Sequence, residues 1–184
     1  DVKEIADAVI DTSLPWQQDN NSHNVPDFTG DVMEITPALM NVKGPPAPGA
    51  FDISRRIEVM DAMGVGKQLM FPTGLGGWAM TLLMHHEYDP GMLSGIKGDR
   101  RAKAAGWLRT YNDWLLSKAK VSDRIRPVPT LLGNTVADLM AETRRMIDAG
   151  IRAVMLPASV APGGRSPAHP DLEPFWTLLE EARC

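Results

Sequence analysis

The chain has 184 residues, of which 43% are apolar and 23% charged, values typical of one soluble globular domain with a sizeable core. The 19 basic and 23 acidic residues give a formal net charge of -4, which excludes a generally basic nucleic-acid binder and a polybasic membrane surface. One cysteine, Cys184, excludes an internal disulfide or a cysteine-based zinc site, and the lack of an apolar run of about 18 residues or a signal peptide indicates a cytoplasmic protein.

The first 50 residues have no sustained pattern. Apolar side chains at helical spacing predict a helix over residues 2–9, and a short strand at residues 8–10 is the alternative. Residues 14–50 are rich in Asn, Asp, Gly and Pro, and the run KGPPAPG at residues 43–49 is incompatible with a helix or a central strand. We expect a long irregular loop region here, which at this length is usually functional or partly disordered.

Residues 51–184 alternate regularly between helical and strand patterns. Helices are predicted over residues 53–63, 78–86, 99–120, 135–149 and 172–183. Short apolar strands are predicted at residues 68–71, 125–131 and 151–156. Two prolines in the second of these strands limit its pairing.

Polar residues and glycines mark the ends of several of these helices. Asp52 is a good N-cap for the first helix, and Gly64 fits the left-handed position after its end. Thr135 is expected to cap a later helix with Asp138 in an approximate capping box, and Gly150 ends that helix.

Asn112 and Asp113 lie among aromatic residues in the predicted helix over residues 99–120. We expect a structural role for them, in which the amide or the carboxylate braces a neighbouring loop.

Strands that alternate with helices of this length indicate parallel pairing and right-handed crossovers. Two architectures fit: an open doubly wound α/β sheet, or part of an eight-stranded (β/α) TIM barrel. Because a complete barrel needs about 250 residues, three strands, or four with residues 8–10, make up about half of one.

Several segments of residues 51–184 together have the residues and the order of a known family. They are RIEVMDAMGV at 56–65, QLMFPT at 68–73, YNDWL at 111–115, DAGIRAVMLP at 148–157, PFW at 174–176 and LEEA at 179–182. This set resembles the amidohydrolase-related family, which includes aminocarboxymuconate-semialdehyde decarboxylase and similar metal-dependent hydrolases.

The resemblance implies a (β/α) TIM barrel of the amidohydrolase type, of which this chain covers about the first half. It implies hydrolysis of a C–N or C–O bond, or decarboxylation, of a small carboxylated or amide substrate at the carboxyl ends of the strands. It also implies a divalent metal, commonly zinc, held by a His-x-His pair after the first strand and by further His and Asp residues. Because half a barrel leaves strand edges open, we expect a homo-oligomer.

The chain departs from this family at the expected metal site. Ser13 and Pro15 stand where the His-x-His pair belongs, and neither side chain is a good ligand for zinc. The remaining family ligands are expected beyond Cys184, so the chain is interpreted as the N-terminal half of a longer enzyme. The alternative is a catalytically inactive barrel that serves as a binding or assembly protein.

Substrate-pocket candidates are taken from positions near predicted strand ends, because these line the pocket of a barrel. His85 ends a helix, where a positive side chain is also favourable without any catalytic role, and Arg165 could clamp a carboxylate. The candidates are Thr73, His85, Pro157, Ser159, Arg165 and His169.

A glycine-rich turn offers a different alternative. Gly74, Gly76 and Ala79 match the loose spacing of the dinucleotide fingerprint, in which backbone N–H groups at a helix start meet a phosphate. A nucleotide-binding α/β protein is therefore a further possibility beside a loop at the mouth of a barrel.

Overall fold

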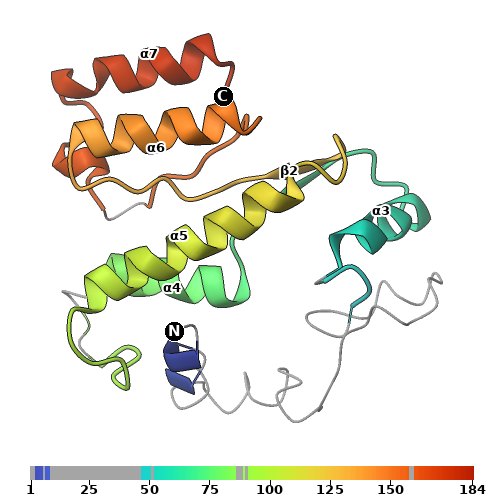
Figure 1. The fold of residues 1–184 in the computed structure, drawn as a ribbon, viewed down its shortest axis with the longest axis horizontal. Coiled ribbons are helices and arrows are strands. Elements are labelled where there is room, and N and C mark those ends of the chain that lie inside the picture. Colours follow the sequence, from blue (N-terminus) through green and yellow to red (C-terminus); the bar gives the residue numbers. More distant parts are fainter. Residues whose placement is uncertain are drawn as a thin grey trace. The chain divides into compact units, whose positions relative to one another are not determined.

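The structure of the chain is a computed structural model that describes residues 3–5, 7–8, 47–50, 52–85, 89, 91–157 and 160–184 (Figure 1). The expectations for Ser13, Pro15, the loop region up to residue 46 and Ser159 lie outside these residues. Contacts divide the chain into two compact units: a larger one of Asp1–Thr12, Leu69–Ala119 and Arg126–Cys184, and a smaller one of Ser13–Gln68 and Lys120–Ile125. Within the described parts of the chain, none of the helices has the length and apolar character needed to cross a membrane.

The smaller unit contains α3 (Ile53–Ala62), which has the predicted caps. The side chain of Asp52 accepts a hydrogen bond from the N–H of Ser54 at 2.9 Å, and Gly64 is left-handed with φ 68°. Met60 is 2% exposed, whereas Met63 follows the helix and is 48% exposed. The helix predicted over residues 53–63 is confirmed as far as Ala62, and Met63 is its C-cap.

Arg124 fixes the loop between α3 and the first strand. Its guanidinium donates to the carboxylate of Asp61 at 2.6 Å and to the carbonyls of Val65 and Gly66 at 2.7 and 2.9 Å. The carbonyl of Arg124 also accepts from the N–H of Gln68 at 2.9 Å, where the sheet begins. One residue thus holds both ends of this loop.

Two short parallel strands, β1 (Gln68–Met70) and β2 (Ile125–Pro127), form the sheet within the described residues. The strand predicted over residues 125–131 is confirmed only at its start, because two prolines lack the N–H that a continuous ladder needs. Pairing resumes at Thr130, which forms a parallel bridge to Met155. β1, β2 and Met155 therefore follow one another in chain order, as both expected architectures allow.

The strand predicted at residues 151–156 is wrong over most of its length, because only Met155 bridges to the sheet. Gly150 is left-handed with φ 91°, and its N–H donates into the last turn of the preceding helix at 2.9 Å. The N–H of Ile151 donates to the carbonyl of Met146 at 3.0 Å. These bonds form a Schellman cap, which occupies the N–H that would begin a strand ladder.

In the larger unit, α4 (Gly74–His85) and α5 (Arg100–Lys118) pack against each other around one apolar cluster (Figure 1). Ile5 and Ala8 join this cluster from a helical segment, which favours a helix over a strand at the start of the chain. α4 begins before the predicted position at Trp78, so the preceding glycines form its first turn.

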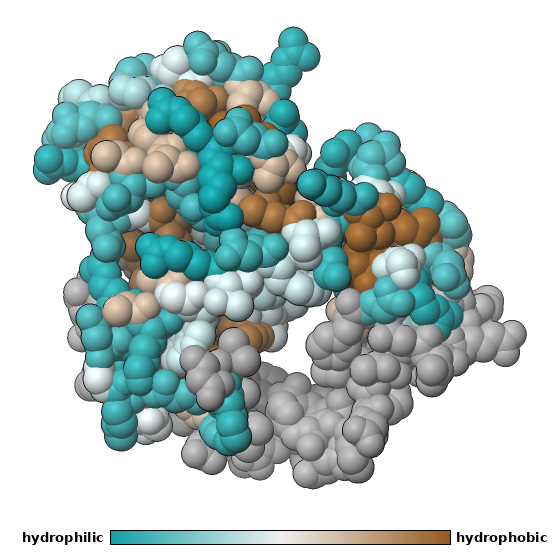
Figure 2. All heavy atoms as spheres, in the orientation of Figure 1, coloured by the Kyte–Doolittle hydropathy of each residue, from teal (hydrophilic) through white to brown (hydrophobic). Residues whose placement is uncertain are grey.

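α6 (Val136–Asp148) and α7 (Glu173–Glu181) lie side by side and enclose a second apolar cluster (Figure 1). The predicted capping box is confirmed. The hydroxyl of Thr135 accepts from the N–H of Asp138 at 3.1 Å, and the Asp138 carboxylate accepts from the N–H of Thr135 at 3.2 Å. Figure 2 shows apolar atoms between the polar side chains over these two helices, at the upper left.

Asn112 of α5 is fully buried and bonds to the backbone of Thr130, which is also fully buried. The amide nitrogen donates to the Thr130 carbonyl at 2.8 Å, and the amide oxygen accepts from the Thr130 N–H at 3.2 Å. The side chain thereby does what a neighbouring strand would do, at a point that β1 does not reach. Asp113 pairs with Arg145 of α6 at 2.7 Å. The predicted bracing role is confirmed for the Asn112 amide, whereas the Asp113 carboxylate pairs with a neighbouring helix.

Candidate functional site

A cavity of about 240 Å³ opens in the larger unit beside the segments that follow β2 and Met155. These segments follow neighbouring parallel positions, and the carboxyl end of such positions is where α/β proteins bind ligands. The apolar part of its wall includes Leu131, Leu132, Leu139, Leu156, Pro157 and Val160.

One face of α5 supplies the cationic part of the wall. Arg101, Ala105 and Arg109 all line the cavity, and their spacing of four residues places them along one side of a helix. The small side chain of Ala105 leaves room between the two long cations.

Local contacts fix the start of α5 and the loop after β2. The carboxylate of Asp99 accepts from the N–H of Ala102 at 2.9 Å and so caps α5. Across the cavity wall, Arg101 donates to the side-chain oxygen of Asn134 at 3.4 Å. A Cβ at Gly133 would lie 2.5 Å from the backbone nitrogen of Leu139, so only glycine lets this loop approach α6 so closely.

The cavity has a surplus of positive charge. Arg101 and Arg109 form no ion pair with any of the residues that the structure describes. Asp99 is the one carboxylate among the lining residues, and its Oδ1 atom is engaged in the helix cap. The lining thus carries two exposed guanidinium groups and one carboxylate, all from α5 and its N-cap, which suits an anionic ligand.

Of the residues predicted for the pocket, Pro157 lines this cavity. Thr73 is exposed before α4, where its carbonyl accepts from the N–H of Gly77 at 3.3 Å. His85 is the last residue of α4, and its carbonyl accepts from the N–H of Asp89 at 2.9 Å. Neither Thr73 nor His85 lines the cavity.

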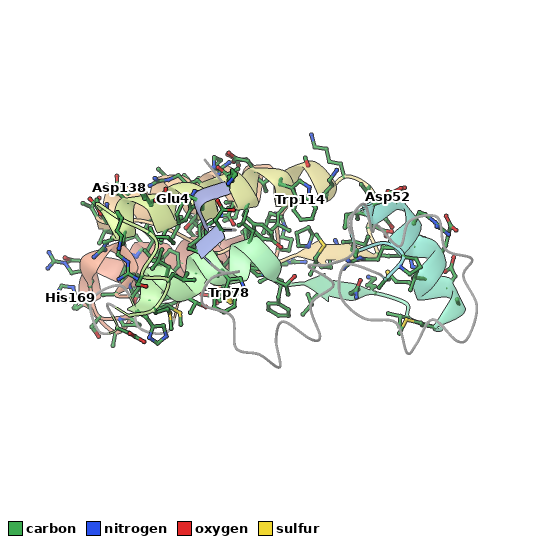
Figure 3. The ribbon with its side chains drawn as sticks, turned by 90° about the horizontal axis from the view of Figure 1, so that it is seen from below. Glu4, Asp52, Trp78, Trp114, Asp138 and His169 are labelled. Atoms are coloured by element: carbon green, nitrogen blue, oxygen red, sulfur yellow. The ribbon has the colours of Figure 1, made fainter. Side chains whose placement is uncertain are left out.

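Arg165 and His169 lie together, away from the cavity lining. Arg165 pairs with Asp171 at 3.2 Å, and the Nδ1 atom of His169 accepts from the N–H of Asp171 at 3.2 Å. His169, which is labelled in Figure 3, thus caps the short 3-10 turn η4 (Pro170–Leu172). A shallow hollow at the start of α6 is lined by Arg165 and by Gly163 and Gly164 of another short turn, η3 (Pro162–Gly164).

The glycines of the dinucleotide-like turn have a packing explanation. A Cβ atom at Gly76 would lie 2.7 Å from the ring of Tyr111, so glycine allows α4 and α5 to approach. Gly74 is left-handed with φ 51° and is exposed. The glycine spacing is thus explained without a bound phosphate, because Gly76 allows the two helices to pack and Gly74 adopts the left-handed conformation at the start of α4.

Sequence reasoning missed Arg101, Arg109 and Asn134. Their signal was two arginines eight residues apart on one side of a predicted helix, with alanine between them. That pattern is also typical of a solvated face, and it points to a site only when a loop from elsewhere in the chain closes against it.

The His, Cys, Asp and Glu side chains of the described residues form no group that could hold a metal ion. No three His, Cys, Asp or Glu side chains come together among them, so they do not fit the metal that the family resemblance implies. Burial raises the pKa of the Cys184 thiol, which favours its unreactive protonated form.

No family model, no curated protein and no solved structure matches the chain significantly. The chemistry of the site therefore rests on its own residues and their geometry.

Proposed function

We propose that the chain is part of a (β/α)-barrel enzyme of the amidohydrolase-related type, which acts on a small molecule bound in the cavity beside α5. The observation that carries this proposal is the position of the cavity, beside the segments that follow β2 and Met155. In barrel enzymes the substrate binds at that end of the strands. The sheet order β1, β2, Met155 and the sequence resemblance over residues 51–184 support the same proposal.

The proposed reaction is hydrolysis of a C–N or C–O bond, or decarboxylation, as the resemblance implies. In either reaction the residues around the cavity bind and orient the substrate. The leucines of the wall exclude water from its apolar part, and the α5 arginines offer planar donors to its polar part. Because the cavity is smaller than the roughly 300–1,000 Å³ of pockets for drug-sized ligands, the substrate is a small molecule.

A substitution that fills the cavity tests this proposal. The full-length protein that contains this chain is assayed with zinc present against amide, ester and lactone substrates, with release of acid as the readout. A parallel assay measures CO₂ released from small carboxylic acids. Ala105→Phe fills the space between the two arginines and is expected to abolish any turnover, whereas Ala141→Phe on the exposed side of α6 retains it.

Circular dichroism checks that both variants fold, and Ala105→Leu replaces Ala105→Phe if the larger side chain prevents folding. Turnover that survives in the folded Ala105 variants would contradict the cavity as the substrate site. Binding of small molecules in the cavity without turnover of any substrate would favour the catalytically inactive barrel instead.

The expected homo-oligomer stays a prediction. Leu69 and Phe71, two positions apart along the chain at β1, are 54% and 49% exposed and provide apolar surface for such an association.

A further inference from the structure

Two positive charges next to the cavity have no anionic partner among the described residues. Elsewhere in the larger unit, Arg145 pairs with Asp113 and Glu142, and Arg165 pairs with Asp171. Arg101 and Arg109 form no ion pair with the described residues; Arg144 forms none either, but only Arg101 and Arg109 also line the cavity. In a chain whose formal net charge is -4, carboxylates are in excess, so two unpaired guanidinium groups on one helix face are not explained by a shortage of partners.

The contact between Arg101 and Asn134 orients one of these guanidinium groups. A neutral amide oxygen accepts one N–H at 3.4 Å, which leaves the charge uncompensated and the other N–H donors available. A guanidinium group offers parallel donors that match the two oxygens of a carboxylate or a phosphate. The contact with Asn134 therefore leaves the charge of Arg101 uncompensated.

The opposite wall of the cavity is apolar. Leu131, Leu139 and Leu156 come from the loop after β2, from α6 and from the segment after Met155. Leu131 and Leu139 are 2% and 1% exposed, so they belong to the packed core beneath the cavity and present little surface to it. The half-buried Leu156 and Val160 supply apolar surface to the cavity, so a ligand that pairs its anionic group with the α5 arginines would also meet an apolar wall.

We infer that Arg101 and Arg109 form the anion subsite of this cavity and that its ligand is a small amphipathic anion: a carboxylate or phosphate group carried on an aromatic or branched apolar body. This inference rests on the proposed function, because it assigns the substrate class of the same cavity. It places substrate binding on α5, and not on the candidates Thr73, His85, Arg165 or His169.

Three probes that share a phenyl ring and differ in their polar group separate the effect of charge from that of apolar contact. The full chain is titrated with benzoate, phenyl phosphate and benzamide, with calorimetry and the NMR shifts of the cavity residues as readouts. Benzoate or phenyl phosphate is expected to bind about tenfold or more tightly than benzamide, because hydrogen bonds to charged groups are the stronger ones. Which of the two anions binds better distinguishes a carboxylate from a phosphate ligand.

Matched charge removals identify the residues. Arg101→Gln and Arg109→Gln are each expected to weaken binding of the preferred anion about tenfold, while benzamide binding is unchanged. Arg144→Gln removes the same charge from the exposed side of α6 and should leave both affinities unaltered. Glutamine is shorter than arginine but keeps a polar amide, so these exposed positions are expected to tolerate it without unfolding.

Equal affinity for benzamide and the two anions would overturn the inference, and so would equal losses in the Arg101→Gln and Arg144→Gln variants. Absence of binding by every probe would also overturn it. These outcomes are distinguishable from failure of the proposed function. If only the anion assignment were wrong, the unsubstituted protein would still turn over its substrate, and Ala105→Phe would still abolish that turnover.

Discussion

The amide of Asn112 forms two hydrogen bonds in the described core, and its removal should lower the free energy of unfolding substantially. Asn112→Ala leaves the N–H and the carbonyl of Thr130 without their partners, at a position where both residues are fully buried. An unpaired buried backbone group costs about 1–3 kcal/mol, so two groups cost about 2–6 kcal/mol. That is a large share of the roughly 5–15 kcal/mol by which domains are stable.

Urea denaturation followed by circular dichroism measures this loss as a shift of the unfolding midpoint. Asp113→Asn is the matched control next to it in α5, because Asp113 forms its ion pair with Arg145 at the surface, where such pairs contribute about 0–1 kcal/mol. An Asn112→Ala protein as stable as the Asp113→Asn protein would refute the strand-like role of the amide.

Asn112→Asp adds a second test, in which the direction of the change in stability with pH is the readout. The introduced carboxylate keeps an acceptor for the Thr130 N–H but places an oxygen without a proton against the Thr130 carbonyl. Burial and this carbonyl favour the protonated acid, so its pKa is raised in the folded state. A raised folded-state pKa means that the variant gains stability as pH falls and loses it as pH rises. Destabilisation independent of pH would contradict the assigned hydrogen bonds.

Two further predictions concern the helices. Gly76→Ala should destabilise the protein by about 1–3 kcal/mol, because the added methyl group overlaps the Tyr111 ring. Gly106→Ala in α5 has nothing within 4 Å of the added atom and should stabilise the protein by about 0.5–1 kcal/mol. Urea midpoints that shift in the same direction in both variants would refute the packing argument. The hydroxyl and then the N–H of Ser54 lower the pKa of the Asp52 carboxyl below its usual value, so the capping contribution is complete above the unfolded-state pKa and is lost as pH falls through the folded-state pKa. Ser54→Ala should raise the pKa of Asp52 in an NMR titration of its carboxyl carbon, and an unchanged value would show that the hydroxyl is not the cause.

The candidate site was only partly accessible to sequence reasoning. Choosing residues that directly follow predicted strands identified Pro157 correctly as a cavity residue. Such residues lie at the carboxyl end of the sheet, where ligands bind. The same rule selected Thr73, which the early start of α4 turns to other contacts. Arg101 was not selected, because its contact with Asn134 joins residues that are distant in sequence.

The sequence by itself determined the helices and several of their ends, as the caps at Asp52 and Thr135 show, although α4 begins earlier than predicted. A cap is satisfied by residues two or three positions away, so its signal is local and readable. The local cap after α6 takes up the Ile151 N–H, whereas only tertiary structure decided that Asn112 would take the place of a strand beside Thr130. Sheet pairing and cavity walls depend on which distant segments meet, and a backbone group that no strand reaches is satisfied by the side chain that the fold brings there.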